Sequence, residues 1–398
     1  MNNIVEFLFG PIYHPIIKYY RERPENQKKL VADCFSTDQT SKKTIYVDIT
    51  QIHKNDVGTG VQRVTNNILK NLEAVAKDYA VERVYIDEKK GVMFCKNNEA
   101  VIFHKNDIFF ELDLNYVLFI RYEKYFRFLM KKGVKVSVFV HDLIPIRFPK
   151  FFDISTCKIQ LKWIKKCIKF NQIIANSYST ISDVSKFIEE NPFYYHNKNI
   201  QLDYALLGCD FADKVNPVQR AKSDKLSFLM VSTVDRRKNY KQVIKAFDLL
   251  WEKGLDIELK IVGRPGWCCE DTIKMLETHS YLGKKLFWYN SGISDEELSK
   301  MYSDCSAVIF ASLAEGFGLA IIEGAYYKKP LILRNLSVFM EIAGDNALYF
   351  NGLEPIDLAN AIEEWIKLYN SGKAPDSSKI ELRTWKDCAE EVYGLLGK

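Results

Sequence analysis

The 398-residue sequence lacks the signals that would place it in several large classes of protein. It has no run of about 18 consecutive apolar residues, so we expect no membrane-spanning helix. The 56 Lys and Arg outnumber the 51 Asp and Glu by only five, too few to indicate a nucleic-acid partner. The apolar stretch from Ile4 to Tyr20 is broken by charges and prolines and does not resemble a signal peptide.

Motifs of several enzyme classes are missing as well. The sequence has no HExxH, GxSxG or Walker loop, and no D-x-D that could hold a divalent metal. Its nine cysteines include no CxxC pair, and the adjacent Cys268 and Cys269 suit neither a shared metal nor an ordinary disulfide. We therefore expect free thiols in a reducing cytoplasm, with no metal and no tightly bound cofactor.

What the sequence does contain is enough apolar material for packed cores, with 47% hydrophobic and 13% aromatic residues. From Thr44 onward, short apolar runs alternate with helix-period segments, which is typical of parallel sheets built from βαβ units. The expected strands are Thr44–Asp48, Val81–Ile86, Tyr116–Ile120, Val134–Val140, Gln172–Ala175, Ser227–Val231, Ile257–Val262, Lys285–Tyr289, Ala307–Phe310 and Pro330–Leu333. The clearest expected helices are Val61–Ala76, Tyr240–Lys253, Asp295–Ser303 and one around Arg383–Leu396.

A segment without clear periodicity divides these elements into two groups. Leu206–Lys225 contains Gly208, Pro217 and several charges, which is typical of an interdomain linker. The sequence therefore predicts a leader, two domains, a linker between them and a final helix that could pack on the first domain. The corresponding ranges are 1–43, 44–210, 211–225, 226–382 and 383–398, with the linker at 211–225.

Two loops of the first half could bind a ligand. Gly58 and Gly60 flank Thr59 just before a helix, where backbone N–H groups could face an anion, although a flexible turn is the alternative. The loop is not GxGxxG, so a nicotinamide dinucleotide site is poorly supported. His141 follows the strand Val134–Val140, at the sheet edge where α/β proteins bind ligands, but it could equally be a satisfied polar strand end.

Two loops of the second half carry more chemistry. The consecutive cations Arg236, Arg237 and Lys238 follow the strand Ser227–Val231, where they could bind phosphate or form a solvated charge run. The loop after Ala307–Phe310 has two glycines before a helix whose N-terminus could hold a diphosphate. This loop and helix also contain two carboxylates eight residues apart, which suit hydroxyl-rich ligands such as sugars and riboses.

A segment over 150–172 is predicted to form an amphipathic helix. Lys158, Lys162, Lys165 and Lys169 form a basic stripe beside an apolar one, with Trp163, Phe151 and Phe152 nearby. Such a helix could sit on an anionic membrane surface, which would place the protein at the inner face of the membrane. A core-packed helix with a solvated lysine face is the alternative.

The sequence resembles retaining glycosyltransferases of family four, also called glycosyl transferases group 1. Glu315 and Glu323 match the E-x7-E element of that family within Glu-Gly-Phe-Gly-Leu, and Arg237–Asn239 match its R-K-N loop. The span from Thr44 to Gly352 follows the family order. The resemblance implies an α/β GT-B fold, in which two Rossmann-like domains with parallel sheets face each other across a cleft.

The resemblance also assigns roles to matched positions. Glu323 would bind the nucleotide ribose and Glu315 the donor sugar, whereas Arg237 and Lys238 would neutralise the leaving diphosphate in place of a metal. His141 would contact the donor sugar or orient the reaction. Further donor-binding positions would be Gly316, Phe317, Gly318, Leu319, Gly263, Arg264 and Ile293, and the loop bordering diphosphate and acceptor would comprise Gly58, Thr59, Gly60 and Arg63.

More narrowly, Thr59–Arg63, His141–Pro145 and Gly263–Trp267 resemble bacterial mannosyltransferases of O-antigen or exopolysaccharide synthesis. The resemblance implies metal-independent, retaining transfer of mannose from GDP-mannose to a glycan or lipid-linked glycan. Rhamnose, glucose or N-acetylglucosamine as the sugar, or a catalytically silent nucleotide-sugar-binding scaffold subunit, remain alternatives. The chain departs from the family pattern at Ser232-Thr233, where many members have Gly-Arg, and at Gly324, where alanine is usual.

Overall fold

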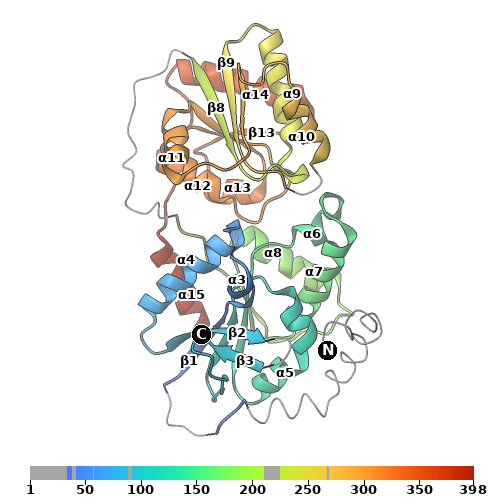
Figure 1. The fold of residues 1–398 in the computed structure, drawn as a ribbon, viewed down its shortest axis with the longest axis vertical. Helices are drawn as coiled ribbons and strands as arrows, with labels where there is room; N and C mark the ends of the chain where they lie inside the picture. The colour runs from blue at the N-terminus through green and yellow to red at the C-terminus, as the bar shows by residue number, and fades with distance from the viewer. Residues whose placement is uncertain (1–33, 38–41, 57, 88–91, 210–224, 267–268) are drawn as a thin grey trace, which may run out of the picture.

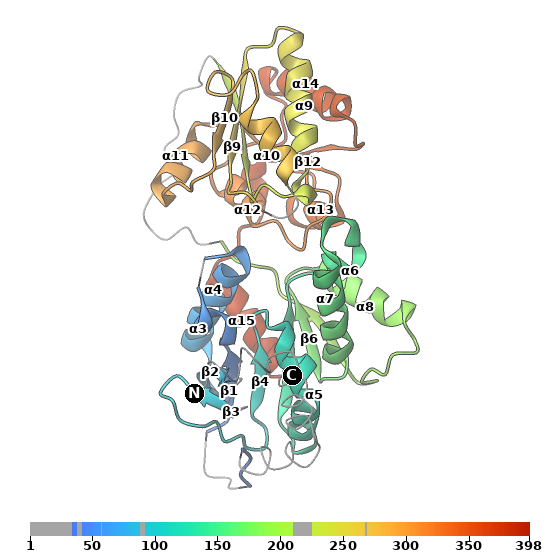
Figure 2. The ribbon, with the colours of Figure 1, turned by 45° about the vertical axis from the view of Figure 1, so that its right-hand side comes forward.

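The computed structural model describes residues 34–37, 42–56, 58–87, 92–209, 225–266 and 269–398. Most of the predicted leader and nearly all of the predicted linker, residues 211–224, lie outside the described residues. Figure 1 shows one domain above the other along the long axis, with the blue and green elements below and the yellow and orange elements above. Each domain is built around one sheet, and helices flank both sheets (Figure 2).

The first domain contains a seven-stranded sheet in the order β3-β2-β1-β4-β5-β6-β7. Its strands are β1 (Thr44–Asp48), β2 (Ala80–Asp87), β3 (Val92–Cys95), β4 (Ile108–Glu111), β5 (Lys135–Val140), β6 (Gln172–Ala175) and β7 (Gln201–Tyr204). Its helices are α3 (Thr50–Lys54), α4 (Gly60–Val75), α5 (Tyr116–Lys131), α6 (Ile144–Arg147), η1 (Pro149–Phe151), α7 (Ile154–Cys167) and α8 (Tyr178–Glu190). The described pairs are parallel except β2 with β3, since the four residues between these strands allow only an antiparallel return.

The second domain contains a six-stranded, fully parallel sheet in the order β10-β9-β8-β11-β12-β13. Its strands are β8 (Leu226–Val231), β9 (Ile257–Val262), β10 (Leu286–Tyr289), β11 (Ala307–Phe310), β12 (Leu331–Arg334) and β13 (Leu348–Phe350). The helices that follow are η2 (Arg236–Lys238), α9 (Tyr240–Glu252), α10 (Glu270–Glu277), α11 (Asp295–Asp304), α12 (Leu319–Tyr326), α13 (Ser337–Ala343), α14 (Pro355–Asn370), η3 (Ser377–Lys379) and α15 (Trp385–Leu396).

One predicted strand was wrong, because Tyr116–Ile120 forms the beginning of α5. The side chain of Asn115 accepts a hydrogen bond from the backbone N–H of Leu118 and caps the helix. The strand of this region is β4, a short buried run that the pattern missed. A five-residue apolar run has too few positions to distinguish a strand from one face of a buried helix.

The last helix, α15, packs on the first domain although it follows the second in sequence (Figure 1). Its residues Trp385, Cys388 and Val392 are buried in one cluster with Ile68 and Leu72 of α4. Lys135 at the start of β5 also donates to the carbonyl oxygen of Leu396, at 2.9 Å. The chain therefore crosses between the domains twice, which ties them together.

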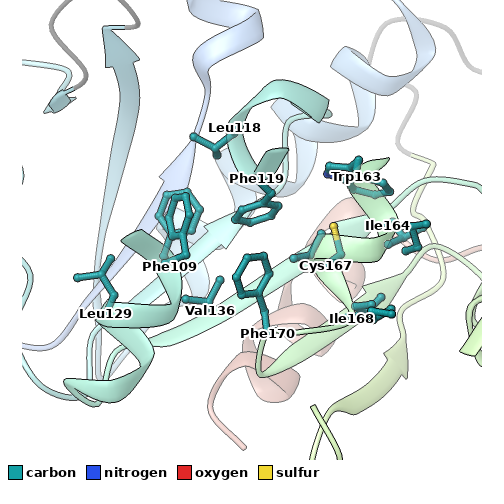
Figure 3. Packing of buried hydrophobic residues seen from close by; sticks show 14 of the residues in the cluster. Phe109, Leu118, Phe119, Leu129, Val136, Trp163, Ile164, Cys167, Ile168 and Phe170 are labelled. Carbon is teal, nitrogen blue, oxygen red and sulfur yellow. The ribbon is translucent and has the colours of Figure 1, made fainter. Parts of the chain in front are cut away.

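Aromatic side chains fill the core of the first domain, as Figure 3 shows. The rings of Phe119 on α5 and Phe170 lie 4.5 Å apart between centroids, and those of Phe109 and Phe126 lie 4.6 Å apart. Trp163 of α7 is fully buried beside them. Much of the high aromatic content is therefore used for packing, because rings bury a large apolar area per side chain.

Within the described residues, no helix is both long and apolar enough to span a bilayer. The eight cysteines in the described part of the chain are all free thiols.

Candidate functional site

A cleft of about 550 Å³ lies between the two domains, at the carboxyl ends of the strands of both sheets. This is the edge at which open α/β sheets bind ligands. The first domain contributes Thr59, Gly60, Val61, Val64, His141, Asp142, Ile144, Phe151, Phe152, Asn176 and Leu207. The second contributes Val231, Ser232, Thr233, Asp235, Arg237, Lys238, Phe310, Glu315, Gly316, Phe317, Gly318, Leu319, Ala320, Glu323 and Phe339. Eleven of the predicted site residues therefore line one cavity.

Glu315 is paired with two cations of the neighbouring loop. Arg237 Nη1 lies 2.7 Å from Glu315 Oε2, and Lys238 Nζ contacts Glu315 Oε1. Burial alone would raise the pKa of Glu315, but the charges of Arg237 and Lys238 overcome that effect and lower it to about 2. The carboxylate is therefore ionised throughout the neutral range. Arg237 and Lys238, which the sequence predicted to bind a diphosphate, are paired with Glu315 in this structure.

The cation loop has a defined conformation. The side chain of Asp235 accepts hydrogen bonds from the backbone N–H groups of Arg237 and Lys238, at 2.9 and 3.1 Å. Asn239 then adopts the left-handed conformation, with φ of 57°, and α9 begins at the next residue. The Asx-type capping and the left-handed residue turn the chain, so that Arg237 and Lys238 face the cleft.

The helix α12 begins in the cleft lining. Its N-cap, Gly318, has φ of 105°, a conformation that residues with a side chain rarely adopt. Among the described residues, no side chain caps this helix. Its first N–H groups and the positive end of its dipole can therefore bind an anionic ligand.

Glu323 lies on α12, nearly buried, and both of its carboxylate oxygens have partners. Tyr302 of α11 donates its hydroxyl to Oε2 at 2.9 Å. Arg63, on α4 of the opposite domain, donates Nη1 to Oε1 at 2.9 Å. The sequence did not indicate Tyr302, because its position in a helix interior carries no motif.

His141 is a buried, neutral imidazole. Burial lowers the pKa of His141 below its ordinary value. Its Nε2 lies 3.1 Å from the carbonyl oxygen of Leu112, which can only accept, so the proton is on Nε2 and Nδ1 is the acceptor. The neutral ring can therefore take a hydrogen bond from a ligand hydroxyl but cannot supply positive charge.

The loop at Gly316 meets the first domain directly. A Cβ at Gly316 would lie 2.4 Å from the carbonyl oxygen of His141, so only glycine fits there. The Gly316 carbonyl oxygen accepts hydrogen bonds from Ser177 Oγ at 2.8 Å and Thr180 Oγ1 at 3.0 Å, both at the start of α8. These two hydrogen bonds cross the domain boundary and hold the loop around Gly316 against the first domain.

A second contact between the domains lies beside this loop. Glu341 of α13 accepts hydrogen bonds from the backbone N–H groups of Tyr178 and Ser179, at 2.6 and 2.9 Å. A carboxylate from the second domain thus caps the N-terminus of α8 in the first. No motif in the sequence marks Ser177, Thr180 or Glu341 as site residues, although Ser177 follows a predicted strand at the sheet edge where site residues collect.

The other predicted site residues lie beside the cleft lining. Gly58 has φ of 68° and precedes α4. Gly263 packs against Ser232, and a Cβ there would lie 1.8 Å from the Ser232 carbonyl oxygen. Arg264 is exposed and lies next to Gly292, and Ile293 packs half-buried against the core of the second domain.

The segment 150–172 differs from its predicted role. Its helix, α7, covers Ile154–Cys167. Trp163 is in the core, and Phe151 is buried in a small cluster with Ala314 of the second domain, so neither is available to a membrane. Lys158 and Lys162 are exposed, and neither has an ion pair among the described residues. Lys169 lies beyond the end of α7 and pairs with Glu123 at 2.8 Å, and Lys165 Nζ lies 3.9 Å from the ring centroid of Tyr194. Of the predicted basic stripe, Lys158 and Lys162 therefore remain exposed on the helix surface.

No group of three or more His, Cys, Asp or Glu in the described part of the chain is arranged to hold a metal ion.

Part of the chain matches a known protein family, and most of it is similar to known mannosyltransferases. Residues 212–379 match the model of the glycosyl transferases group 1 family. The chain is 33% identical over 372 residues to the serotype-specific mannosyltransferase WbdA of Escherichia coli, which covers 87% of this chain and 44% of that protein. It is 24% identical over 217 residues to the O-antigen chain mannosyltransferase RfbU of Salmonella typhimurium, covering 54% of this chain and 56% of RfbU. The chain thus spans less than half the length of WbdA.

Solved structures share the fold. HepE of Anabaena, determined with UDP and glucose, has a TM-score of 0.57 at 14% identity, over 89% of this chain and 95% of HepE. Sucrose-phosphate synthase of Thermosynechococcus elongatus has a TM-score of 0.57 at 15% identity, over 89% and 94% of the two chains. Residues 212–379, which form most of the second domain, therefore match the glycosyl transferases group 1 family, and the chain has the two-domain GT-B fold.

Proposed function

We propose that this chain is a glycosyltransferase that transfers mannose from GDP-mannose to a glycan or lipid-linked glycan acceptor in the synthesis of a cell-surface polysaccharide. The observation that carries the proposal is the cluster of Glu315, Arg237 and Lys238 beside the start of α12 in the interdomain cleft. It combines a carboxylate that can bind hydroxyl groups with an anion site, which suit the sugar and the adjoining diphosphate of a nucleoside-diphosphate sugar. The mannosyltransferase relatives support the choice of sugar.

The diphosphate would bind between the cation loop and the N-terminus of α12. Arg237 and Lys238 would exchange part of their contact with Glu315 for phosphate oxygens, and the helix N–H groups would take others. These charges would stabilise the leaving diphosphate as the bond to the sugar breaks. HepE, which has the same fold, was solved with UDP-glucose, so the fold accommodates a nucleotide sugar.

Transfer would proceed with retention, on one face of the sugar. The bond between the anomeric carbon and the diphosphate oxygen breaks, and the acceptor hydroxyl oxygen forms its bond from the same side. The hydroxyl proton passes to the departing phosphate oxygen. Glu315 and the neutral His141 would accept hydrogen bonds from sugar hydroxyls and fix the ring during this step.

A panel of nucleotide sugars, assayed by mass spectrometry with and without EDTA, tests the proposal. We expect mannosyl transfer from GDP-mannose in both conditions, an α-linked product by NMR, and loss of turnover in Glu315→Ala. Glu364→Ala, an exposed glutamate of the same domain, should retain activity. Full activity of Glu315→Ala would refute the site, and GDP binding without any transfer would favour a silent scaffold.

The acceptor would be presented at an anionic membrane, to which the basic stripe of α7 binds. A groove of about 930 Å³ runs along α7 and α5, and its lining includes Arg121, Lys158, Lys162 and the aromatic residues Phe193 and Tyr195. Phe193 is 96% exposed. Lysines beside exposed rings suit an interface of anionic headgroups and acyl chains.

Vesicle flotation tests this surface. Wild-type protein should float with vesicles that contain anionic phospholipid and not with purely zwitterionic ones. Lys158→Glu combined with Lys162→Glu should abolish flotation, whereas Lys245→Glu combined with Lys300→Glu, exposed lysines of the second domain, should not. Unchanged flotation of the α7 variant would refute the membrane surface.

A further inference from the structure

The ion pair between Arg63 and Glu323 joins the two domains at the edge of the donor site. Arg63 is the fourth residue of α4 in the first domain, and Glu323 lies in the middle of α12 in the second. Their charged atoms are 2.9 Å apart. The Glu323 side chain is 6% exposed and that of Arg63 is 43% exposed, so Arg63 reaches from solvent to a nearly buried carboxylate.

Both partners of Glu323 are held in place. The first turn of α4 has a reciprocal capping box, in which Thr59 Oγ1 accepts from Gln62 N and Gln62 Oε1 accepts from Thr59 N. On the other side, Tyr302 is buried and its ring stacks on Tyr327 at 5.1 Å, with the planes 2° apart. The carboxylate of Glu323 is therefore fixed from two elements that belong to different domains.

The geometry leaves one acceptor position on each oxygen. An ionised carboxylate has about four lone-pair positions, two on each oxygen. Tyr302 uses one on Oε2, and Arg63 uses one on Oε1. The remaining two suit a pair of neighbouring hydroxyl groups, which can each donate one hydrogen bond, as the 2′ and 3′ hydroxyls of a ribose do.

We propose that Arg63 and Tyr302 are positioning residues that orient Glu323 toward the ribose of the nucleotide. Because Arg63 comes from the opposite domain, ribose recognition depends on the approach of the two domains. The inference rests on the proposed function, in which Glu323 binds the ribose.

Calorimetric titration with GDP and 2′,3′-dideoxy-GDP tests the inference. The wild-type chain should bind GDP about tenfold more tightly than 2′,3′-dideoxy-GDP, because the dideoxy compound lacks the two hydroxyl groups that would donate hydrogen bonds to the charged Glu323. Arg63→Ala and Tyr302→Phe should each weaken GDP binding about tenfold and change dideoxy-GDP binding less than threefold. Arg63→Lys should restore part of the loss. Arg83→Ala removes an exposed ion pair with Glu73 elsewhere in the first domain and should change neither affinity.

These affinities distinguish ribose binding by Glu323 from the positioning role of Arg63. Equal affinity of the wild-type chain for the two nucleotides would refute ribose binding by Glu323. A wild-type preference for GDP, together with an equal loss of both affinities in Arg63→Ala, would refute the positioning role alone.

A second measurement tests the dependence on domain approach. Glu341→Ala loosens the other domain contact and should weaken GDP binding about threefold in the wild-type background, but not in the Arg63→Ala background. Additive losses would show that Arg63 acts independently of domain approach and would refute that part of the inference.

Discussion

Arg237 Nη1 lies 2.7 Å from Glu315 Oε2, so a cation expected at the diphosphate already holds the carboxylate expected at the sugar. Glu315 offsets part of the charge of its two cations, and Asp235 Oδ2 lies 3.7 Å from Arg237 Nη2. A ligand phosphate that reaches Arg237 must therefore compete with Glu315 or share the cation with it. Under the proposed function, the balance between these two anions would set both the affinity for nucleotide and the position of Glu315.

Glu315→Gln should separate binding from transfer. The amide removes the competing charge, so Arg237 and Lys238 become available, and GDP should bind as tightly as to the wild-type chain or several-fold more tightly. Turnover should fall about 10²- to 10³-fold, the usual cost of losing one electrostatic contact to the reacting centre. Calorimetry and initial rates measure the two effects, with Glu364→Gln as control. A tenfold weaker GDP affinity would show that Glu315 is needed to position the cations.

Gly316→Ala should disrupt the contact between the two domains at the Gly316 loop. The new methyl group would lie 2.4 Å from the His141 carbonyl oxygen, which is backbone and cannot rotate away. We expect turnover to fall at least about tenfold, because the loop around Gly316 must move away from the first domain. Gly394→Ala, where a Cβ has open space, is the control. Wild-type rates in Gly316→Ala would contradict the observed domain contact.

Glu341→Ala should weaken the contact between the two domains at the N-terminus of α8. Loss of the cap on α8 costs at most about 1 kcal/mol, which raises the donor KM by about three- to fivefold while kcat changes little. The comparison variant is Asp345→Ala, an exposed acid two residues beyond α13. Steady-state kinetics measure the donor KM and kcat. An unchanged KM would mean that the contact between Glu341 and α8 does not contribute to donor binding.

Asp48→Asn should change how stability depends on pH. Asp48 is buried at the end of β1, and burial raises its pKa to about 7, above the value near 4 expected for the unfolded chain. Its contribution is therefore fully present below about pH 4 and is lost as the pH rises through 7.

Denaturant midpoints between pH 4 and 8 measure this effect. The difference in midpoint between Asp48→Asn and the wild-type chain should grow in favour of the variant as the pH rises. Glu82→Gln, an exposed carboxylate on β2, should show no such trend. A constant difference for Asp48→Asn would show that this carboxyl does not titrate in the folded protein.

The α/β class, most of the strands and the loops that contain the site can be predicted from the amino-acid sequence. These depend on local signals, namely apolar runs of strand length and glycines or charges directly after them. The segment Ser312–Glu323 and the cations Arg237 and Lys238 were recognisable because their spacing and loop position have chemical meaning. Tyr116–Ile120 failed because a short apolar run looks alike in a strand and in a buried helix.

Which side chains come into contact depends on the packing of the folded chain. Local periodicity does not show that α15 returns to the first domain, or that Trp163 and Phe151 are buried. The pairing of Arg63 with Glu323, 260 residues apart, depends on how two separately formed sheets dock. No short-range pattern encodes that docking, since it arises from the complementary shapes and charges of surfaces assembled from distant parts of the chain.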